Sequence, residues 1–201
     1  YNARDLSEQG FENVEYCPCL VEPRPGRRKA SEPALLFVGR ISPSKNCLEL
    51  VEQAEAAARL TGLRLTLHVV GEGKRHCRYH RRFRREIEQC GRRGRLRVAV
   101  HERLPLAELD ALYGAAWLYV SLSRHEGFGL PVLEAILGGA PAVYRACGGT
   151  EAVLEGCGLL AAGRPAAEGI AELLTNERRR RELWERQREL AGQFTPERLR
   201  G

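Results

Sequence analysis

Two glutamates on either side of a glycine turn are the side chains best suited to ligand chemistry. Glu126 and Glu134 lie in the stretch RHEGFGLPVLEA, residues 124–135. An apolar, β-rich run precedes it and a helical pattern follows, so we expect a strand, a turn and a helix. The first amides of a helix lack partners within it and favour a phosphate, whereas carboxylates accept hydrogen bonds from sugar hydroxyls. Together these groups predict a nucleotide sugar as the ligand.

The residues between the glutamates suit a chain that approaches a ligand closely. Gly127 and Gly129 permit a positive φ, and Pro131 suits the first helical position, where no amide hydrogen is needed. A plain βα turn with two surface glutamates explains the same residues, because a lone G-x-G before a helix is a weak signal. A second group of residues is needed to decide.

Two cations after an earlier strand supply that second group. The run ALLFVG (34–39) reads as a buried strand, and RISPSKN (40–46) follows it. Arg40 and Lys45 surround the start of a helix predicted from about residue 45 to 60, with Ser44 as its cap. Ligands of open α/β sheets bind at the carboxyl ends of strands, so these cations could neutralise a diphosphate. The alternative is two solvated loop charges.

Length and composition indicate one globular domain that favours anionic partners. The chain has 201 residues, 43% of them apolar, and a net charge of +6. No apolar run approaches the roughly 20 residues of a membrane span, and no signal peptide is visible. The seven cysteines lack zinc-type spacing, so we expect reduced thiols, no metal and a cytosolic protein. Because the chain lacks methionine and opens on Tyr1, we expect a piece of a longer protein.

Alternating strand and helix patterns predict an α/β fold. The expected architecture is a Rossmann-like, mainly parallel sheet of about six strands with helices on both faces. The dinucleotide fingerprint G-x-G-x-x-G is absent after the first strand, which argues against NAD or FAD. The further strands are predicted at 63–70, 95–100, 117–122, 140–144 and 158–161, and the later helices at 106–116, 150–155, 165–174 and 177–194. The first of these helices should bury the side that carries Leu106, Leu109, Tyr113 and Ala116.

We expect three segments along the chain. Residues 1–33 read as an interdomain segment, with a short helix at 5–10 and solvated basic residues at 27–29. Residues 34–176 form the nucleotide-sugar-binding domain, and 177–201 a C-terminal helix and tail anchored by Trp184.

The most basic stretch of the chain, residues 74–97, contains a helix. Tyr79, Phe83, Ile87 and Cys90 recur at helical spacing and predict one buried stripe, with arginines on the other faces. A solvated helix face is the simplest interpretation. Docking of the basic helix, Arg78 to Arg97, on anionic lipid headgroups is the alternative, which would place the protein peripherally at a membrane. No nucleic-acid motif accompanies the charge, so no nucleic acid is expected as a partner.

The combined motifs resemble the C-terminal, donor-binding domain of the family 4 retaining glycosyltransferases of GT-B fold (glycosyl transferases group 1). The resemblance rests on FVGRISPSKN (37–46), GEG (71–73) and HEGFGLPVLEA (125–135), in which the two glutamates form the family's E-x7-E pattern. Ser123, GGAP (138–141) and GGTEAV (148–153) agree as well. Glu102 and Leu122 depart from the family's pattern.

The resemblance implies a role for each matching residue. Glu126, Arg40 and Lys45 would be the catalytic residues, the two cations holding the donor's diphosphate without a metal or other cofactor. Glu126 would lie by the donor sugar, and Glu134 would accept hydrogen bonds from the ribose. The remaining donor-binding residues would act largely through their backbone, Leu104 at the base and the others at the sugar and phosphates: Gly39, Leu104, Gly127, Phe128, Gly129 and Leu130.

The resemblance also implies the reaction. The intact enzyme would transfer a hexose, such as mannose, from a UDP- or GDP-linked donor to a glycan or lipid-linked acceptor. A preceding domain would bind that acceptor, so this chain alone should turn over little. A non-catalytic nucleotide-sugar-binding module with a regulatory or scaffold role is the alternative.

Overall fold

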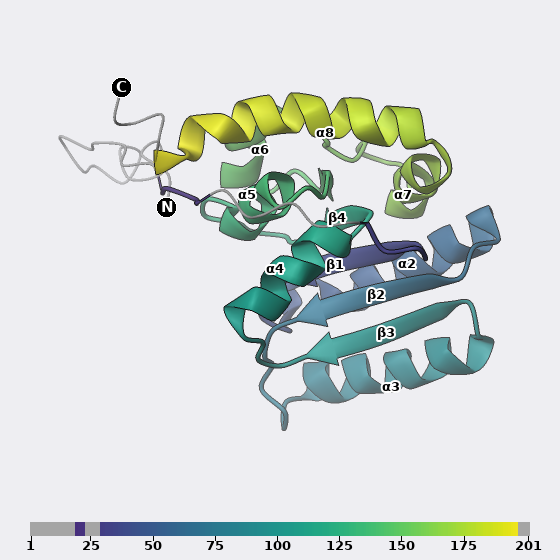
Figure 1. Cartoon of the computed structure of the whole chain (residues 1–201). Helices are drawn as coiled ribbons and strands as arrows, with labels where there is room; N and C mark the ends of the chain where they lie inside the picture. The colour runs from purple at the N-terminus through teal and green to yellow at the C-terminus, as the bar shows by residue number, and fades with distance from the viewer. Residues whose placement is uncertain (1–18, 23–28, 197–201) are drawn as a thin grey trace.

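Five parallel strands form the single sheet in the part of the chain that the computed structural model describes, residues 19–22 and 29–196 (Figure 1). This confirms the predicted Rossmann-like α/β fold. The strands are β1 (Ala34–Val38), β2 (Leu65–Val70), β3 (Leu96–His101), β4 (Leu118–Ser121) and β5 (Ala142–Tyr144), in the spatial order β3-β2-β1-β4-β5.

The sixth predicted strand is reduced to one isolated bridge. Leu159 pairs with Tyr144 of β5, but no ladder continues from it. Gly156 and Gly158 have φ values of 74° and 92°, and this left-handed backbone interrupts the extended conformation that a strand requires.

Helices cover both faces of the sheet and create two cores (Figure 1). Residues of β1 alternate between them, with Leu35 and Phe37 in one core and Leu36 in the other. The first face carries α2 (Cys47–Thr61), α3 (Arg78–Arg93) and α7 (Ala166–Thr175), and the second carries α4 (Leu106–Ala115), α5 (Leu130–Leu137) and α8 (Glu177–Ala191). The shorter elements are η1 (Pro43–Lys45), α6 (Gly149–Leu154) and η2 (Gly192–Phe194).

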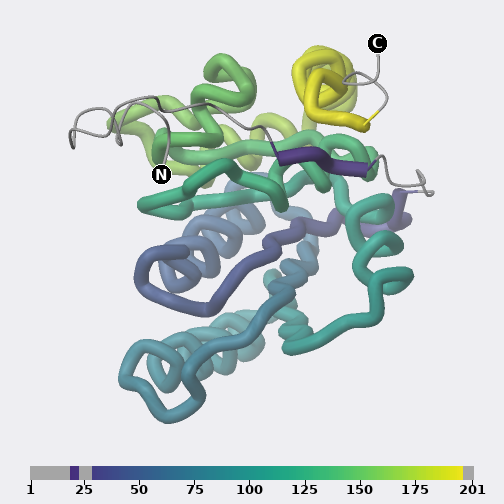
Figure 2. The backbone as a smooth tube through the Cα atoms, turned by 90° about the vertical axis from the view of Figure 1, so that its left-hand side faces the viewer, coloured from purple at the N-terminus to yellow at the C-terminus, as the bar shows by residue number. Residues whose placement is uncertain are grey.

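The strand order reverses at β1, and this reversal defines where a ligand can bind. From β1 the chain adds β2 and β3 on one side, then returns to add β4 and β5 on the other. The loops after β1 and β4 therefore leave adjacent strands in opposite directions and open a crevice at the carboxyl edge. Figure 2 views the molecule from the side to which the strands of Figure 1 point.

The last helix is joined to the edge strand β5 by side-chain hydrogen bonds. Gln187 accepts a hydrogen bond from the amide of Ala142 at 2.8 Å and donates to its carbonyl at 2.7 Å. Further along β5, the amide of Tyr144 donates to the carbonyl of Gly158, and the carbonyl of Tyr144 accepts from the amide of Leu160. Trp184 donates from Nε1 to the carbonyl of Ile136 at 2.9 Å, which agrees with its predicted role as an anchor.

Four local expectations are refined, corrected or lie outside the described residues. Lys29 is exposed, as predicted, but its ammonium also donates to the carbonyls of Ala116 and Gly139 at 2.6 Å each. Ser44 does not cap α2; it lies inside η1, and Asn46 occupies the cap in left-handed conformation. Leu106, predicted on the buried side of its helix, is 66% exposed, since it is the first helical residue. The predicted helix at 5–10 falls outside the described residues.

Candidate functional site

The loops after β1 and β4 meet at the switch point of the sheet. The amide of Arg124 donates to the carbonyl of Ser44 at 2.9 Å. The ammonium of Lys45 lies 2.6 Å from a carboxylate oxygen of Glu126, and their side chains are only 19% and 14% exposed. The predicted cation and the first predicted carboxylate therefore form one ion pair at the carboxyl edge.

Backbone hydrogen bonds join the turn after β4 to the loop that precedes α6. The amide of Glu126 donates to Cys147 at 3.0 Å, and the amide of Gly149 donates to the carbonyl of Glu126 at 3.2 Å. A Cβ on Gly149 would lie 1.8 Å from the carbonyl oxygen of Gly127, so only glycine permits this approach. Gly129 has a φ of 86°, and a Cβ there would lie 2.3 Å from the hydroxyl of Thr150.

The amides of this turn form a group of hydrogen-bond donors. Val132 and Leu133 donate to the carbonyl of Gly129, which caps α5 in left-handed conformation. The amides of residues 127–130 donate to no other described residue. Pro131 is the second residue of α5 rather than the first, which still suits its missing amide hydrogen. The positive end of the α5 dipole is therefore open to an acceptor.

Glu134 is oriented by a buried tyrosine. Tyr113, on α4, donates its hydroxyl hydrogen bond to Oε2 of Glu134 at 2.7 Å and is fully buried. Phe128 packs edge-on against Phe194, with ring centroids 5.4 Å apart. Leu104, after β3, is half-buried against the same core. The second carboxylate and the two apolar candidates therefore border one core.

The remaining candidates belong to the loop after β1. The amide of Gly39 donates to the carbonyl of Val70 at 2.9 Å. A Cβ on Gly71 would lie 2.2 Å from the carbonyl oxygen of Gly39. This close crossing explains the first glycine of the predicted GEG segment. Arg40 is exposed, and its guanidinium makes no hydrogen bond or ion pair to another described residue.

Some residues around the site could not be assigned from the sequence. Arg145, after β5, forms an ion pair with Glu49 in the first turn of α2. Tyr113 was predicted to be buried, but its contact with Glu134 carried no sequence signal. Arg124 precedes the motif by one residue, and its position next to Ser44 becomes visible only once β1 and β4 are adjacent.

The ion pair of Glu49 and Arg145 makes a pH-dependent contribution to stability. The hydrogen bonds from Arg145, followed by the bond from Asn46, lower the pKa of Glu49 below its usual value of 4.5. A lowered pKa in the folded state stabilises the fold above pH 4.5, and this contribution is lost as the pH falls through the folded pKa. We expect Glu49→Gln to lower the free energy of unfolding by about 1 kcal/mol at neutral pH, because both partners are partly exposed.

Urea unfolding at neutral pH and at about pH 3 tests this expectation. The difference between wild type and Glu49→Gln should shrink at the lower pH. Glu52→Gln is the matched control, since Glu52 lies on the same helix, is exposed and makes no ion pair to a described residue. A difference that is the same at both pH values would contradict the assignment.

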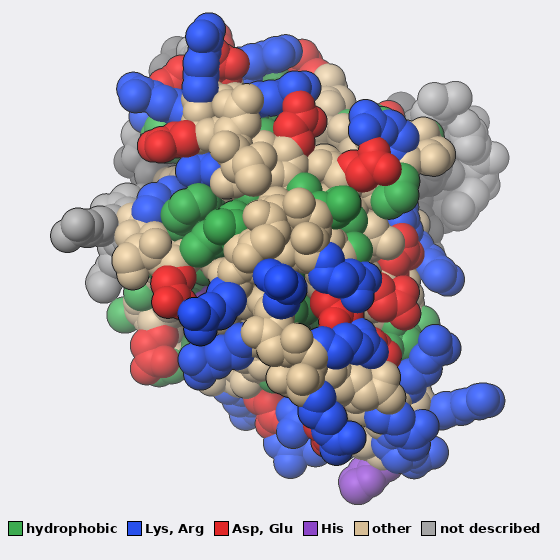
Figure 3. All heavy atoms as spheres, turned by 90° about the vertical axis from the view of Figure 1, so that its right-hand side faces the viewer, with side chains coloured by type: hydrophobic (Ala, Val, Ile, Leu, Met, Phe, Trp, Pro, Cys, Tyr) green, Lys and Arg blue, Asp and Glu red, His purple; other side chains and the backbone are tan. Residues whose placement is uncertain are grey.

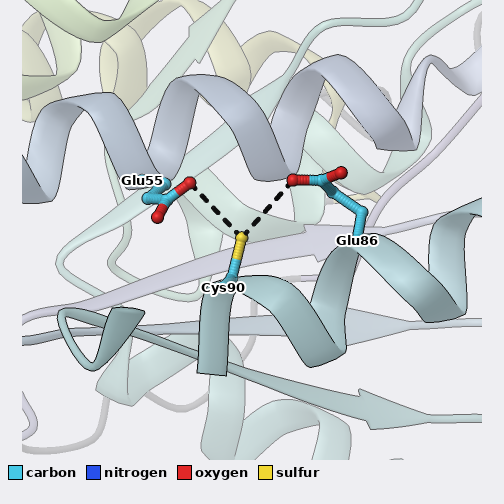
Figure 4. Close-up of side chains that lie close together, drawn as sticks. All are labelled: Glu55, Glu86 and Cys90. Atoms are coloured by element: carbon cyan, nitrogen blue, oxygen red, sulfur yellow. Dashed lines mark hydrogen bonds between the residues drawn. The ribbon is translucent and has the colours of Figure 1, made fainter. Parts of the chain in front are cut away.

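A cluster of Glu55, Glu86 and Cys90 between α2 and α3 has the contacts of a structural network (Figure 4). The thiol of Cys90 donates to Glu55 at 3.5 Å and lies 3.9 Å from Glu86. Arg93 forms ion pairs with both carboxylates. Burial, reinforced by the charge of Glu55, raises the pKa of Cys90 to about 12. The contacts of Cys90 and Arg93 with Glu55 therefore join α2 to α3.

Three further expectations concern the cysteines, the basic helix α3 and membrane spans. The six described cysteines, all except Cys17, are free thiols. Phe83 and Cys90 are buried and most arginines of α3 are exposed. Lysine and arginine side chains gather over the lower part of the face in Figure 3, at the height where Figure 1 places α3. Among the described helices, none has the length and apolar character needed to cross a bilayer.

Comparisons with known proteins find similar sequences and a similar fold. The sequence profile of the family described as glycosyl transferases group 1 matches residues 22–190. The chain is 30% identical over 125 residues to the UDP-N-acetylglucosamine–peptide N-acetylglucosaminyltransferase GtfA subunit of Streptococcus gordonii, covering 62% of this chain and 22% of that protein. It is 31% identical over 113 residues to the O-antigen chain mannosyltransferase B of Escherichia coli, covering 54% and 27%.

A solved structure shows the same fold. A mutant of TarM from S. aureus, in complex with fondaparinux, alpha-GlcNAc-glycerol and UDP, superimposes with a TM-score of 0.78 at 20% identity, covering 97% of this chain and 40% of that one. The chain therefore matches about a quarter of the length of the curated relatives and less than half of the solved structure.

Proposed function

Because the chain belongs to the glycosyl transferases group 1 family, we propose that its carboxyl-edge site binds the nucleotide-sugar donor of a retaining glycosyl transfer. The observation that carries the proposal is the meeting of Lys45 and Glu126 beside the amides of residues 127–130. A cation and unpaired amides favour a diphosphate, and a carboxylate favours sugar hydroxyls. A nucleotide sugar has both groups.

Each residue then has a chemical task. Lys45 and Arg40 neutralise the diphosphate and the negative charge that grows on it as the glycosidic bond breaks. The amides of residues 127–130 hold the phosphates and the sugar. Glu126 accepts hydrogen bonds from the donor sugar and keeps the ammonium of Lys45 in place. Glu134, oriented by Tyr113, accepts hydrogen bonds from the ribose hydroxyls.

The reaction as a whole belongs to a longer protein in this proposal. A hexose, with mannose as the first sugar to test, passes from a UDP- or GDP-linked donor to a glycan or lipid-linked acceptor held by a preceding domain. The name of the S. gordonii relative specifies UDP-N-acetylglucosamine, and that of the E. coli relative specifies mannosyl transfer. Both sugars therefore belong in the test.

Thermal unfolding of this chain with UDP, GDP and NADH tests the donor site. A nucleotide at 100 times its dissociation constant should stabilise the fold by about 2.7 kcal/mol. We expect a saturable shift with UDP or GDP and none with NADH. A shift with NADH alone, or none with either diphosphate, would refute the donor site. If a diphosphate binds but the intact protein transfers neither mannose nor N-acetylglucosamine, the non-catalytic binding module replaces the enzyme.

A further inference from the structure

A hollow of about 590 Å³ lies between the first turns of α2 and α3, next to the proposed donor site. Three arginines, Arg78, Arg82 and Arg124, line it together with Tyr79 and Glu49. Arg124 precedes Glu126 by two residues, and its amide is bonded to the loop that carries Lys45. The hollow and the donor site therefore share the loops after β1 and β4.

The three arginines of the hollow have unused hydrogen-bonding capacity. Their guanidinium groups make no hydrogen bond or ion pair to a described residue, whereas Arg93 and Arg145 are bonded to carboxylates. The first turn of α3, where Arg78 lies, contains no acidic residue. A cation at the positive end of a helix dipole is unfavourable, so the arrangement costs stability unless an anion is present.

The other groups in the hollow leave its charge positive. Glu49 is already neutralised by Arg145 and bonded to Asn46, so its charge is compensated. Glu52 is the remaining acid among the lining residues. The hydroxyl of Tyr79 accepts a hydrogen bond from the amide of Leu48 at 3.1 Å. Burial raises the pKa of Tyr79, so the hydroxyl keeps its proton and can donate a hydrogen bond to a ligand.

We infer that this hollow binds a phosphate group carried by the acceptor. A guanidinium offers a planar pair of donors that matches phosphate, and three of them around one space exceed what a single carboxylate ligand can use. The shared loops place such a phosphate beside the sugar that is to be transferred. Its assignment to the acceptor rests on the proposed function, whereas the anion site itself does not.

The inference is tested by titrating glycerol 3-phosphate into the isotopically labelled chain saturated with UDP, followed by NMR. We expect the amide signals of residues 78–82 and 124 to shift. Arg82→Gln should weaken binding by about tenfold or more, because it removes a charge-assisted hydrogen bond. Arg92→Gln is the matched control: Arg92 is exposed on the same helix, lies outside the hollow and makes no side-chain hydrogen bond or ion pair to a described residue. It should change the affinity by less than about twofold.

Equal weakening by both variants, or no shift in wild type, would overturn the site. Thermal unfolding checks that the variants fold, and Arg78→Gln repeats the test from the neighbouring turn. Vesicles of phosphatidylglycerol, compared with phosphatidylcholine, distinguish the source of the phosphate. Binding of vesicles that Arg82→Gln loses and Arg92→Gln keeps indicates a lipid-linked acceptor, and binding of glycerol 3-phosphate alone indicates a free one.

The donor and acceptor assignments can fail separately. Lys45→Ala should lose UDP and, without UDP, still bind glycerol 3-phosphate, while Arg82→Gln should retain UDP. If wild type binds glycerol 3-phosphate through Arg82 but never binds UDP or GDP, the anion site stands and its assignment to an acceptor falls.

Discussion

Replacing Lys45 by alanine is expected to lower kcat/KM for glycosyl transfer by the intact protein by about 100-fold or more. The ammonium lies 2.6 Å from a carboxylate oxygen of Glu126, in the turn whose amides are proposed to hold the diphosphate. Its removal takes away a charge-assisted contact that strengthens as the leaving diphosphate gains charge. The same variant of this chain should lose the stabilisation by UDP or GDP.

The control for this variant is Lys74→Ala. Lys74 is exposed, follows β2 and makes no side-chain hydrogen bond or ion pair to a described residue. It removes the same charge and should leave transfer unchanged. Glu126→Gln separates the two roles of the pair: it keeps Lys45, but it should loosen the position of the ammonium and weaken the proposed contact with the donor sugar. Turnover near that of wild type in Lys45→Ala would remove Lys45 from the site.

Gly149→Ala is expected to lower the free energy of unfolding by about 3 kcal/mol. The added methyl group would lie 1.8 Å from the carbonyl oxygen of Gly127, and a backbone atom cannot move away as a flexible side chain can. The turn that carries Glu126 must therefore separate from the loop before α6. Because the amides that are proposed to bind the donor belong to that turn, nucleotide affinity should fall together with stability.

Gly91→Ala provides the matched control. Gly91 lies within α3, and a Cβ there would meet nothing within 4 Å. Alanine in a helix is favoured over glycine by up to about 1 kcal/mol, so this variant should be unchanged or slightly more stable. Urea unfolding measures both variants. Equal stability of Gly149→Ala and wild type would mean that the two loops are not held as described.

The sequence predicted the helices and strands better than it predicted their arrangement in space. Apolar runs such as 34–39 predicted the strands, because strands buried on both faces lack polar positions. Periodicity does not report the order β3-β2-β1-β4-β5, so the meeting of Lys45 and Glu126 depended on the family resemblance. The predicted sixth strand failed because the pattern of apolar residues does not reveal the positive φ of Gly156 and Gly158.

Individual side-chain contacts could not be predicted from the sequence. Lys29 reads as one of several basic linker residues, and only the packed chain brings two carbonyl groups within reach of its ammonium. Tyr113 was expected in the core from its spacing on α4, but its hydroxyl needed a partner, and Glu134 on α5 provides it. Such pairs join residues far apart in the chain, which local patterns cannot relate.

The contact of Gln187 with Ala142 has a consequence for how copies of this protein behave towards one another. An outermost strand whose amides and carbonyls are unsatisfied can recruit a strand from another molecule and start aggregation. The primary amide of Gln187 imitates a peptide group and occupies both backbone positions of Ala142, while Gly158 and Leu160 occupy those of Tyr144. The charged surface helix α8 thus shields the β5 edge of the sheet from pairing with another copy.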